Sequence, residues 1–317
     1  MALPNKESIE YAHRLIEPFI HRTPILSSEQ INDILKCEIV FKCENFQKVG
    51  AFKSRGAVNA VFSLDDNSLK YGVCTHSSGN HAQALARAAK IKGIPAYIIM
   101  PENAPEVKVN AVRDYGGVIH FCKANLEARE STLAKVQQKT NAIEIHPYDN
   151  YKIIEGQATA AKELLEEHDD LDYIIAPVGG GGLLAGTALA NHFFAKNTKV
   201  IAAEPENADD ALRSFREGHI IPSINPQTIA DGLLTSVGER NFPIIQEYVE
   251  DIISCSEENI KKAMHLIWER MKIIVEPSAA VPLAIIMEHK ERFAGKRIGI
   301  ILSGGNVDLK NIQDILF

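Results

Sequence analysis

The segment from about residue 72 to residue 149 alternates short apolar runs with amphipathic runs at a nearly constant interval. Strands that alternate with helices at this spacing build βαβ units and therefore a parallel sheet. The pattern restricts this part of the chain to an α/β fold. Strands are predicted at 72–76, 96–100, 118–122 and 142–146, and helices at 80–92, 105–115 and 125–139.

The same alternation continues after residue 150, and the N-terminal segment adds a strand between two helices. We therefore expect two lobes: a small α/β domain, residues 72–149, inserted into a larger discontinuous domain, residues 1–71 and 150–317. The active site would then lie in the cleft between the lobes. The predicted helices of the larger domain are 8–20, 54–64, 156–168, 183–195, 257–271 and 278–289, and its strands are 38–43, 173–178, 200–204, 252–255 and 297–302.

Composition narrows the function to small-molecule chemistry. Apolar residues make up 45% of the 317 residues and charged residues 24%, and the net charge of −7 comes without a run of like charges. We therefore expect no nucleic-acid partner and no membrane contact. The N-terminus lacks the features of a signal peptide, and five scattered cysteines without CxxC spacing indicate reduced thiols, so a cytoplasmic location is expected.

The first chemical motif is the octapeptide 50–57, in which Lys53 is enclosed by small residues after the apolar run 39–41. An amine withdrawn from water loses part of its positive charge and becomes a nucleophile able to hold a carbonyl as a Schiff base. The alternative is an ordinary lysine at a helix start that faces water. The octapeptide alone does not decide between the two.

Four consecutive glycines, Gly179, Gly180, Gly181 and Gly182, follow a predicted strand and open a predicted helix. Backbone N–H groups at a helix N-terminus form a site suited to phosphate. A competing interpretation is a dinucleotide fingerprint, Gly180-x-Gly182-x-x-Ala185, with Glu204 ending the next strand as the ribose-binding acid. A third is a loop that needs only close packing between helix and sheet.

Two further polar motifs lie where predicted strands end. The sequence Ser77-Ser78-Gly79-Asn80-His81 stands at a strand-to-helix junction, where one residue would be an ordinary N-cap and the others could grip a carboxylate or move a proton. The sequence Ser303-Gly304-Gly305-Asn306 follows the last strand at the edge where parallel sheets place ligands, or else forms a simple tight turn.

A third polar cluster is formed by Glu204, Asp209 and Asp210 near Pro205. Carboxylate oxygens of this kind suit magnesium or calcium. Taken alone, the cluster is more typical of a solvated loop than of a metal site.

The motifs at 50–57, 77–81, 179–182 and 303–306, in this order over nearly the full chain, resemble those of the fold-type II pyridoxal-phosphate enzymes. The resemblance is greatest to the serine racemase and serine/threonine dehydratase branch. It implies the two-lobed tryptophan synthase β-like fold, with parallel sheets covered by helices on both faces. Four ordered motifs are far more specific than a partial dinucleotide fingerprint, so they displace the dehydrogenase hypothesis.

The resemblance also implies roles for single residues. Lys53 would carry the cofactor and remove the substrate α-proton, while Phe52 would stack near the ring and Asn80 would bond its hydroxyl. Ser303 would face the pyridine nitrogen, and a neutral hydroxyl there suits elimination better than transamination. The phosphate would be held by Gly179, Gly180, Gly181, Gly182 and Leu183, and the substrate by Ser77, Ser78, Asn80, His81 and Arg129.

Ser78 separates racemase from dehydratase in this resemblance, because dehydratases of the family carry alanine there. A second proton carrier facing Lys53 permits racemisation, whereas dehydration of serine or threonine needs only Lys53. The family's dehydratase of threo-3-hydroxyaspartate is similar enough to stay open as the alternative. A scaffold without turnover and a β-replacement enzyme are the remaining alternatives, and the intact motifs speak against both.

The resemblance supports the hypothesis of a metal site and implies further binding partners. Glu204, the carbonyl of Ala208 and Asp210 match the racemase group's divalent-cation site, which implies Mg²⁺ or alternatively Ca²⁺ or Mn²⁺. Lys48 and Val49 lie where the animal racemase binds nucleotide, which leaves a nucleotide effector open. A homodimer acting on a small amino acid is the family expectation.

Overall fold

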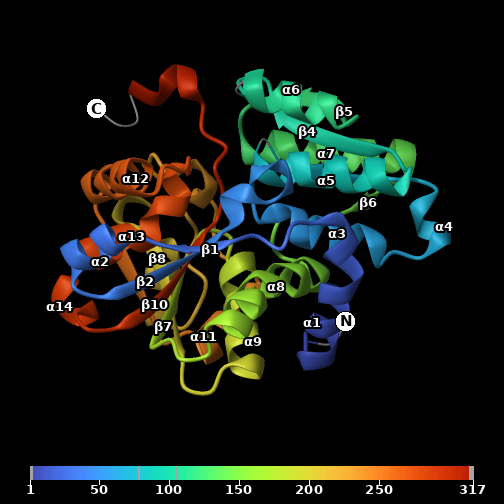
Figure 1. Cartoon of the computed structure of the whole chain (residues 1–317). Coiled ribbons are helices and arrows are strands. Elements are labelled where there is room, and N and C mark those ends of the chain that lie inside the picture. Colours follow the sequence, from blue (N-terminus) through green and yellow to red (C-terminus); the bar gives the residue numbers. More distant parts are fainter. Residues whose placement is uncertain (1–2, 78, 105, 314–317) are drawn as a thin grey trace.

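The computed structural model describes residues 3–77, 79–104 and 106–313, and within them the strands form two separate sheets (Figure 1). The larger sheet has the order β1 (Ile25–Ser27), β2 (Glu38–Cys43), β10 (Arg297–Leu302), β7 (Tyr173–Pro177), β8 (Lys199–Pro205) and β9 (Asp251–Cys255). The smaller sheet has the order β5 (Val118–Cys122), β4 (Ala96–Pro101), β3 (Val73–His76) and β6 (Ile143–Glu144). All neighbouring strands are parallel except β1, which runs antiparallel to β2.

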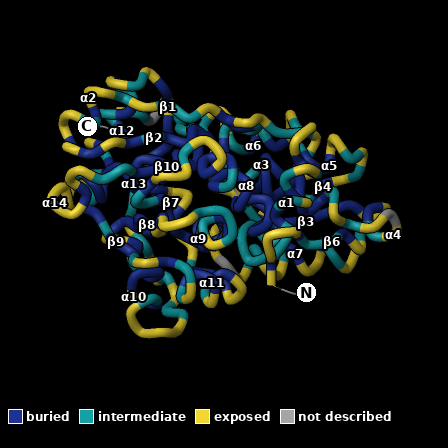
Figure 2. The backbone as a smooth tube through the Cα atoms, turned by 60° about the horizontal axis from the view of Figure 1, so that its bottom comes forward, coloured by how far each residue is buried: buried dark blue, intermediate teal, exposed yellow. Residues whose placement is uncertain are grey.

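Helices cover both faces of the larger sheet, as the family resemblance implies. Successive residues of a strand point to opposite faces, and Ile174 and Ile175 of β7 accordingly belong to different core clusters. One cluster packs against α2 (Glu29–Leu35), α12 (Glu257–Met271) and α13 (Pro277–Glu288), and the other against α8 (Tyr151–Glu167), α9 (Gly182–Phe194) and α11 (Asn241–Tyr248). Figure 2 shows the buried backbone concentrated inside the molecule and exposed backbone at its periphery.

The smaller sheet is also covered on both faces. Its two core clusters involve α5 (Asn80–Lys92) and α6 (Glu106–Asp114) on one side and α7 (Leu126–Thr140) on the other. The first cluster includes Ala57, Val58 and Val61 of α3 (Lys53–Phe62), so the helix that begins with Lys53 packs against the smaller sheet. The domain boundaries at 72 and 149 stay a prediction.

Most predicted elements coincide with the structure to within two residues, and two helices differ. The helix expected at 8–20 is α1 (Lys6–Ile16), followed by one 3₁₀ turn (Glu17–Phe19) that begins beside Pro18. The helix expected at 156–168 begins earlier, at Tyr151, because the Asn150 side chain accepts hydrogen bonds from the N–H groups of Lys152 and Ile153.

Among the described residues, no helix combines the length and the apolar character needed to cross a bilayer.

The sequence pattern missed the shorter helices. The remaining elements are α4 (Asp66–Leu69), α10 (Asp210–Glu217), α14 (Lys290–Phe293) and the 3₁₀ turns Glu44–Phe46, Lys48–Gly50, Glu206–Ala208, Asp231–Leu233 and Leu309–Asn311.

Candidate active site

The segment that carries Lys53 is joined to the segment after β10. The backbone N–H of Phe52 donates to the carbonyl of Ser303 at 3.0 Å, and Gly305 N–H donates to the Gly50 carbonyl at 2.9 Å. Ala51 and Gly304 form an isolated antiparallel bridge between these two contacts. Two motifs separated by about 250 residues in the sequence therefore form one edge of the site.

Lys53 is the first residue of α3, and its partly buried side chain reaches a backbone carbonyl. The Nζ atom donates to the Pro147 carbonyl at 2.8 Å and lies 5.0 Å from the centre of the Phe52 ring. Burial lowers the pKa of Lys53 to about 8, although the carboxylate of Glu276 acts in the opposite direction. A substantial fraction of the amine is therefore neutral near pH 8, as a nucleophile requires.

Asn80 is held by two partners that the sequence places far away. Its amide donates to both carboxylate oxygens of Glu276, at 2.9 and 3.1 Å, and its Oδ1 accepts from Asn306 at 2.9 Å. Asn306 also donates to the Val49 carbonyl at 2.7 Å. These bonds fix the orientation of the Asn80 amide at the N-terminus of α5.

Glu276 is a site residue that sequence reasoning missed. It is 4% exposed, and burial, together with the charge of Asp231, raises its pKa to about 7. The available signal was a single charged residue directly before a largely apolar helix, α13, where an N-terminal carboxylate is favourable. Nothing in that local pattern pointed to Asn80, which lies 196 residues away.

The glycine loop after β7 is shaped by what surrounds it. A Cβ on Gly180 would lie 2.3 Å from the Tyr148 ring, and one on Gly179 would lie 2.9 Å from the Cα of Leu233. Gly181 has a positive φ of 89°, and α9 starts at Gly182 without a side-chain cap. The loop therefore presents backbone N–H groups at a helix N-terminus in a space that only glycine allows.

The histidines near Lys53 are held as neutral, structural groups. Nε2 of His81 contacts the Ile145 carbonyl at 3.0 Å, and Nδ1 of His146 accepts from Asp149 N–H at 2.8 Å. Burial lowers the pKa of His81 to about 3 and that of His146 to about 4, and the charge of Lys53 acts in the same direction on both. The His81 ring is therefore uncharged near neutral pH, and its buried Nδ1 has no hydrogen-bond partner among the described residues.

The structure brings some of the other expected site residues to the site edge and leaves others untested. Ser77 accepts a hydrogen bond from Gly79 N–H at 3.3 Å, and Ser303 is buried directly after β10. Arg129 lies on α7, and its buried Nε has no partner in the part of the chain that the structure describes. Burial lowers the pKa of His76, and the charge of Arg129 lowers it further. Ser78 lies outside the described residues.

A family model described as pyridoxal-phosphate dependent enzyme matches residues 16–304. The chain belongs to this family. It is 50% identical over 312 residues to the beta-hydroxyaspartate dehydratase of Paracoccus denitrificans, and the alignment covers 98% of this chain and 99% of that protein. It is 51% identical over 320 residues to the serine racemase of Dictyostelium discoideum, with 100% and 99% covered. A crystal structure of serine racemase from the same organism matches with a TM-score of 0.93 at 51% identity, over 97% of this chain and 100% of that one.

The described residues fit the cofactor of the pyridoxal-phosphate dependent enzymes. The glycine loop is a cradle that a Cβ would fill, at a helix N-terminus that favours an anion. Lys53, an amine with a lowered pKa, begins α3, and Asn80, an amide of fixed orientation, begins α5. The phosphate, the aldehyde and a ring substituent each have a matching group.

The candidate cation ligands lie between β8 and α10. Glu204 accepts from the N–H groups of Ala211 at 2.9 Å and Leu212 at 2.8 Å. Neither oxygen of buried Asp210 makes a hydrogen bond of ordinary geometry with a described residue. Burial raises the pKa of Glu204 to about 9 and that of Asp210 to about 6. No cluster of three or more His, Cys, Asp or Glu side chains suited to a metal occurs in the described part of the chain, so a site here also needs the Ala208 carbonyl.

Proposed function

We propose that this chain interconverts L- and D-serine and eliminates water from serine, and from threonine to a lesser extent, with pyridoxal phosphate bound through Lys53. The observation that carries the proposal is the amine of Lys53, because burial lowers its pKa to about 8. The glycine loop, where a Cβ would clash, supplies a matching site for the phosphate. The serine racemase name of a relative that is 51% identical over the full chain supports the substrate.

The cofactor supplies, when bound, a conjugated ring that withdraws electrons and so acidifies the α-carbon of an attached amino acid. The N–H groups of Gly179, Gly180, Gly181, Gly182 and Leu183 would bind the phosphate. Phe52 would pack on the ring, Asn80 would bond the ring hydroxyl and Ser303 would face the ring nitrogen. Ser77, Asn80, His81 and Arg129 would hold the substrate.

Two proton carriers distinguish the two reactions. Lys53 would take the α-proton on one face, and its lowered pKa lets the amine accept that proton near neutral pH. Ser78 would supply a proton from the other face, which completes racemisation. Dehydration needs only the first step, followed by departure of the β-hydroxyl.

The test of this assignment is Ser78→Ala. We expect racemisation and turnover of D-serine to fall about a hundredfold or more, while dehydration of L-serine falls less, because only the latter avoids Ser78. Equal loss of all three activities would reduce Ser78 to a structural role.

A second candidate is the dehydration of 3-hydroxyaspartate, which two observations favour. A relative that is 50% identical bears the name beta-hydroxyaspartate dehydratase, and the buried Nε of Arg129 has no partner in the described residues. A free guanidinium donor suits a second substrate carboxylate. If this is the main reaction, kcat/KM for 3-hydroxyaspartate exceeds that for serine, and Arg129→Ala lowers the first more than the second.

We also propose that Glu204, the Ala208 carbonyl and Asp210 bind a divalent cation, Mg²⁺ or alternatively Ca²⁺ or Mn²⁺. Glu204 and Asp210 are buried carboxylates that form no ion pair within the described residues, which supports this, since a bound cation would offset their charge. The expected result is that millimolar MgCl₂ raises the Tm of wild type and leaves that of Asp210→Asn unchanged. An equal rise in both would contradict the site.

The remaining proposals concern assembly and location. We propose a cytoplasmic homodimer, for which the five free, buried cysteines support a reducing compartment. A nucleotide effector near Lys48 and Val49 is proposed with it. Light scattering tests the dimer, and turnover with and without a nucleoside triphosphate tests the effector.

A further inference from the structure

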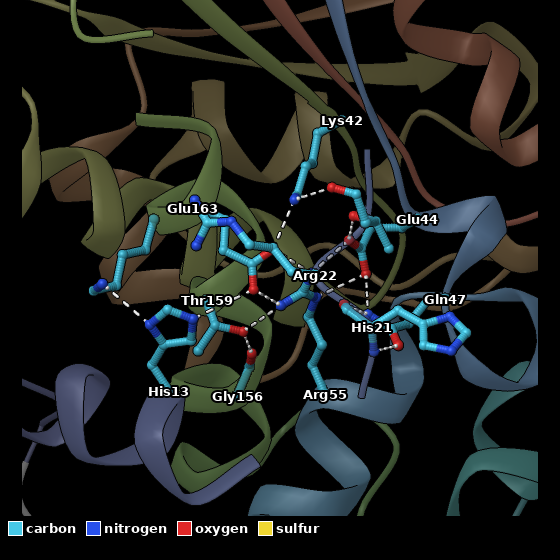
Figure 3. A network of polar contacts seen from close by, with 12 residues as sticks. His13, His21, Arg22, Lys42, Glu44, Gln47, Arg55, Gly156, Thr159 and Glu163 are labelled. Atoms are coloured by element: carbon cyan, nitrogen blue, oxygen red, sulfur yellow. Dashed lines mark hydrogen bonds and ion pairs between the residues drawn. The ribbon is translucent and has the colours of Figure 1, made fainter. Parts of the chain in front are cut away.

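A fully buried network of charged groups lies behind the helix that carries Lys53 (Figure 3). Its charged members are Lys42 of β2, Glu44 just after β2, Arg55 of α3 and Glu163 of α8. None of the four is more than 1% exposed. Two cations and two carboxylates balance, so the network carries no net charge of its own.

Arg55 is the centre of this network, and each of its five N–H groups has an acceptor. Nε and Nη2 donate to the two oxygens of Glu44, both at 2.8 Å. Nη1 and Nη2 donate to the two oxygens of Glu163, at 2.7 and 2.8 Å. The fifth bond runs from Nη1 to Thr159 Oγ1 at 3.0 Å. A planar guanidinium bound in two forks has one allowed position and orientation.

The other members hold the two carboxylates in place. Lys42 donates to Glu163 at 2.6 Å and to the Thr23 carbonyl at 2.8 Å, and the Thr23 hydroxyl donates to Glu44 at 2.6 Å. Burial would raise the pKa of Glu163, but hydrogen bonds from His13 and Arg55 hold it well below its usual range. The carboxylate is therefore charged throughout the working pH range.

Stability alone does not account for such a network. Apolar residues of similar volume often stabilise a core as well as a buried ion pair does, because the desolvation cost is then avoided. What a fork of hydrogen bonds adds is a defined geometry. The question is which part of the molecule needs it.

The geometry connects Arg55 to Lys53. Residues two apart on a helix point to nearly opposite sides, so Arg55 fixes the back of the turn whose front presents the Lys53 amine. A Cβ on Gly156 of α8 would lie 2.6 Å from the Cα of Gly56, so α3 and α8 are in backbone contact beside the network. Glu163 and Thr159 belong to the same α8.

Helix α8 in turn contacts the helix of the glycine loop. A Cβ on Gly186 of α9 would lie 2.7 Å from the Ala158 nitrogen and 2.8 Å from the Ile154 carbonyl oxygen. Three helices thus stack in the order α3, α8, α9. The outer two begin with Lys53 and with Gly182 of the phosphate loop.

We propose that Arg55 and Glu163 are positioning residues that fix the Lys53 amine relative to the glycine loop, with α8 as the rigid spacer between them. The inference rests on the proposed cofactor. The consequence is that the network affects attachment of the cofactor's aldehyde to Lys53 more than it affects binding of the cofactor's phosphate by the glycine loop. Small displacements of a reacting group lower reactivity steeply.

The experiment compares two probes on the purified, cofactor-free protein. Pyridoxal phosphate binds the glycine loop and reacts with Lys53, which gives a visible absorption band, whereas pyridoxamine phosphate has no aldehyde and cannot react. For Arg55→Lys we expect affinity for pyridoxal phosphate to fall about tenfold or more, and affinity for pyridoxamine phosphate to change less than about twofold. Thr159→Val removes one acceptor of Arg55 together with the bond that the hydroxyl donates to the Gly156 carbonyl. It should change the ratio of the affinities for pyridoxal phosphate and pyridoxamine phosphate about threefold.

Arg22→Lys is the matched control. Arg22 forms exposed ion pairs with Glu166 and Glu167 of the same α8, so we expect both affinities to stay at wild-type values. Equal loss of both affinities in Thr159→Val, or no change in Arg55→Lys, would overturn the positioning role. If Arg55→Lys does not fold, Thr159→Val decides. A wild type without a visible band would overturn the proposed cofactor instead.

Discussion

Lys42 is fully buried and Lys53 is partly buried, and only Lys42 forms an ion pair with a carboxylate among the described residues. Lys42 is 0% exposed, and its amine forms an ion pair with Glu163 at 2.6 Å. Lys53 donates to the uncharged Pro147 carbonyl and forms no ion pair within the described residues. Burial lowers the pKa of both amines, and that of Lys53 falls to about 8. A paired lysine is structural, whereas an unpaired one keeps a reactive amine.

The largest expected effect is the loss of chemistry in Lys53→Ala. Without the amine, we expect turnover to fall about a thousandfold or more and the visible absorption band of the bound cofactor to be absent. The free energy of unfolding should stay at the wild-type value or rise, because no unpaired amine is buried. Activity within tenfold of wild type would remove the distinction between the two lysines.

Lys42→Met should show the converse behaviour. It deprives Glu163 of one cation in a dry environment, so we expect a loss of about 3 kcal/mol in the free energy of unfolding. Arg55 still holds Glu163, so turnover per folded molecule should stay within about threefold of wild type. Urea unfolding and a rate assay on the same sample measure both quantities. Normal stability with lost turnover would reverse the roles of the two lysines.

The cofactor-free protein should become more stable as the pH rises above 8. Lys53 has a pKa of about 8 when folded, against an ordinary value of 10.5, so the unfolded chain binds more protons between these pH values. Its charged amine therefore costs stability below pH 8, and this cost disappears toward pH 10.5. Urea unfolding should show wild type gaining about 1 to 3 kcal/mol over this range relative to Lys53→Met. Parallel curves would mean that the amine is not desolvated.

The smallest expected effect concerns Glu276, a carboxylate whose charge acts on Lys53. Glu276 raises the pKa of that amine, so Glu276→Gln should lower it further. We expect the midpoint of the pH dependence of cofactor attachment to move down by about half a unit, with Glu269→Gln, an exposed substitution on α12, as the control. A shift to higher pH would contradict the assigned electrostatics.

The sequence pattern predicted the parts of the fold that have strong periodicity. The helices at Asn80–Lys92 and Glu257–Met271 and the strands Glu38–Cys43 and Arg297–Leu302 were predicted to the residue. The early start of α8 was missed because Gly156 reads as a helix boundary, whereas the structure keeps it inside the helix for contact with Gly56. Short α2 has seven residues and too little apolar periodicity to be detected.

The site was predicted as motifs but not as a network. Lys53, Asn80 and the glycine loop each have a local signature at a helix start, which sequence reasoning can recognise. Glu276 and Glu163 have none, since each is one acidic residue whose partners lie more than 100 positions away. Their roles follow from tertiary packing alone.

One assay tests the central claim that Lys53 and its partner groups perform serine chemistry with two proton carriers. The purified protein is incubated with pyridoxal phosphate, MgCl₂ and L-serine, and D-serine and pyruvate are measured separately over time. We predict that both products form, that the ratio of D-serine to L-serine becomes constant, and that pyruvate accumulates. Pyruvate without D-serine would contradict the racemase assignment, and the absence of both products would contradict the account of Lys53.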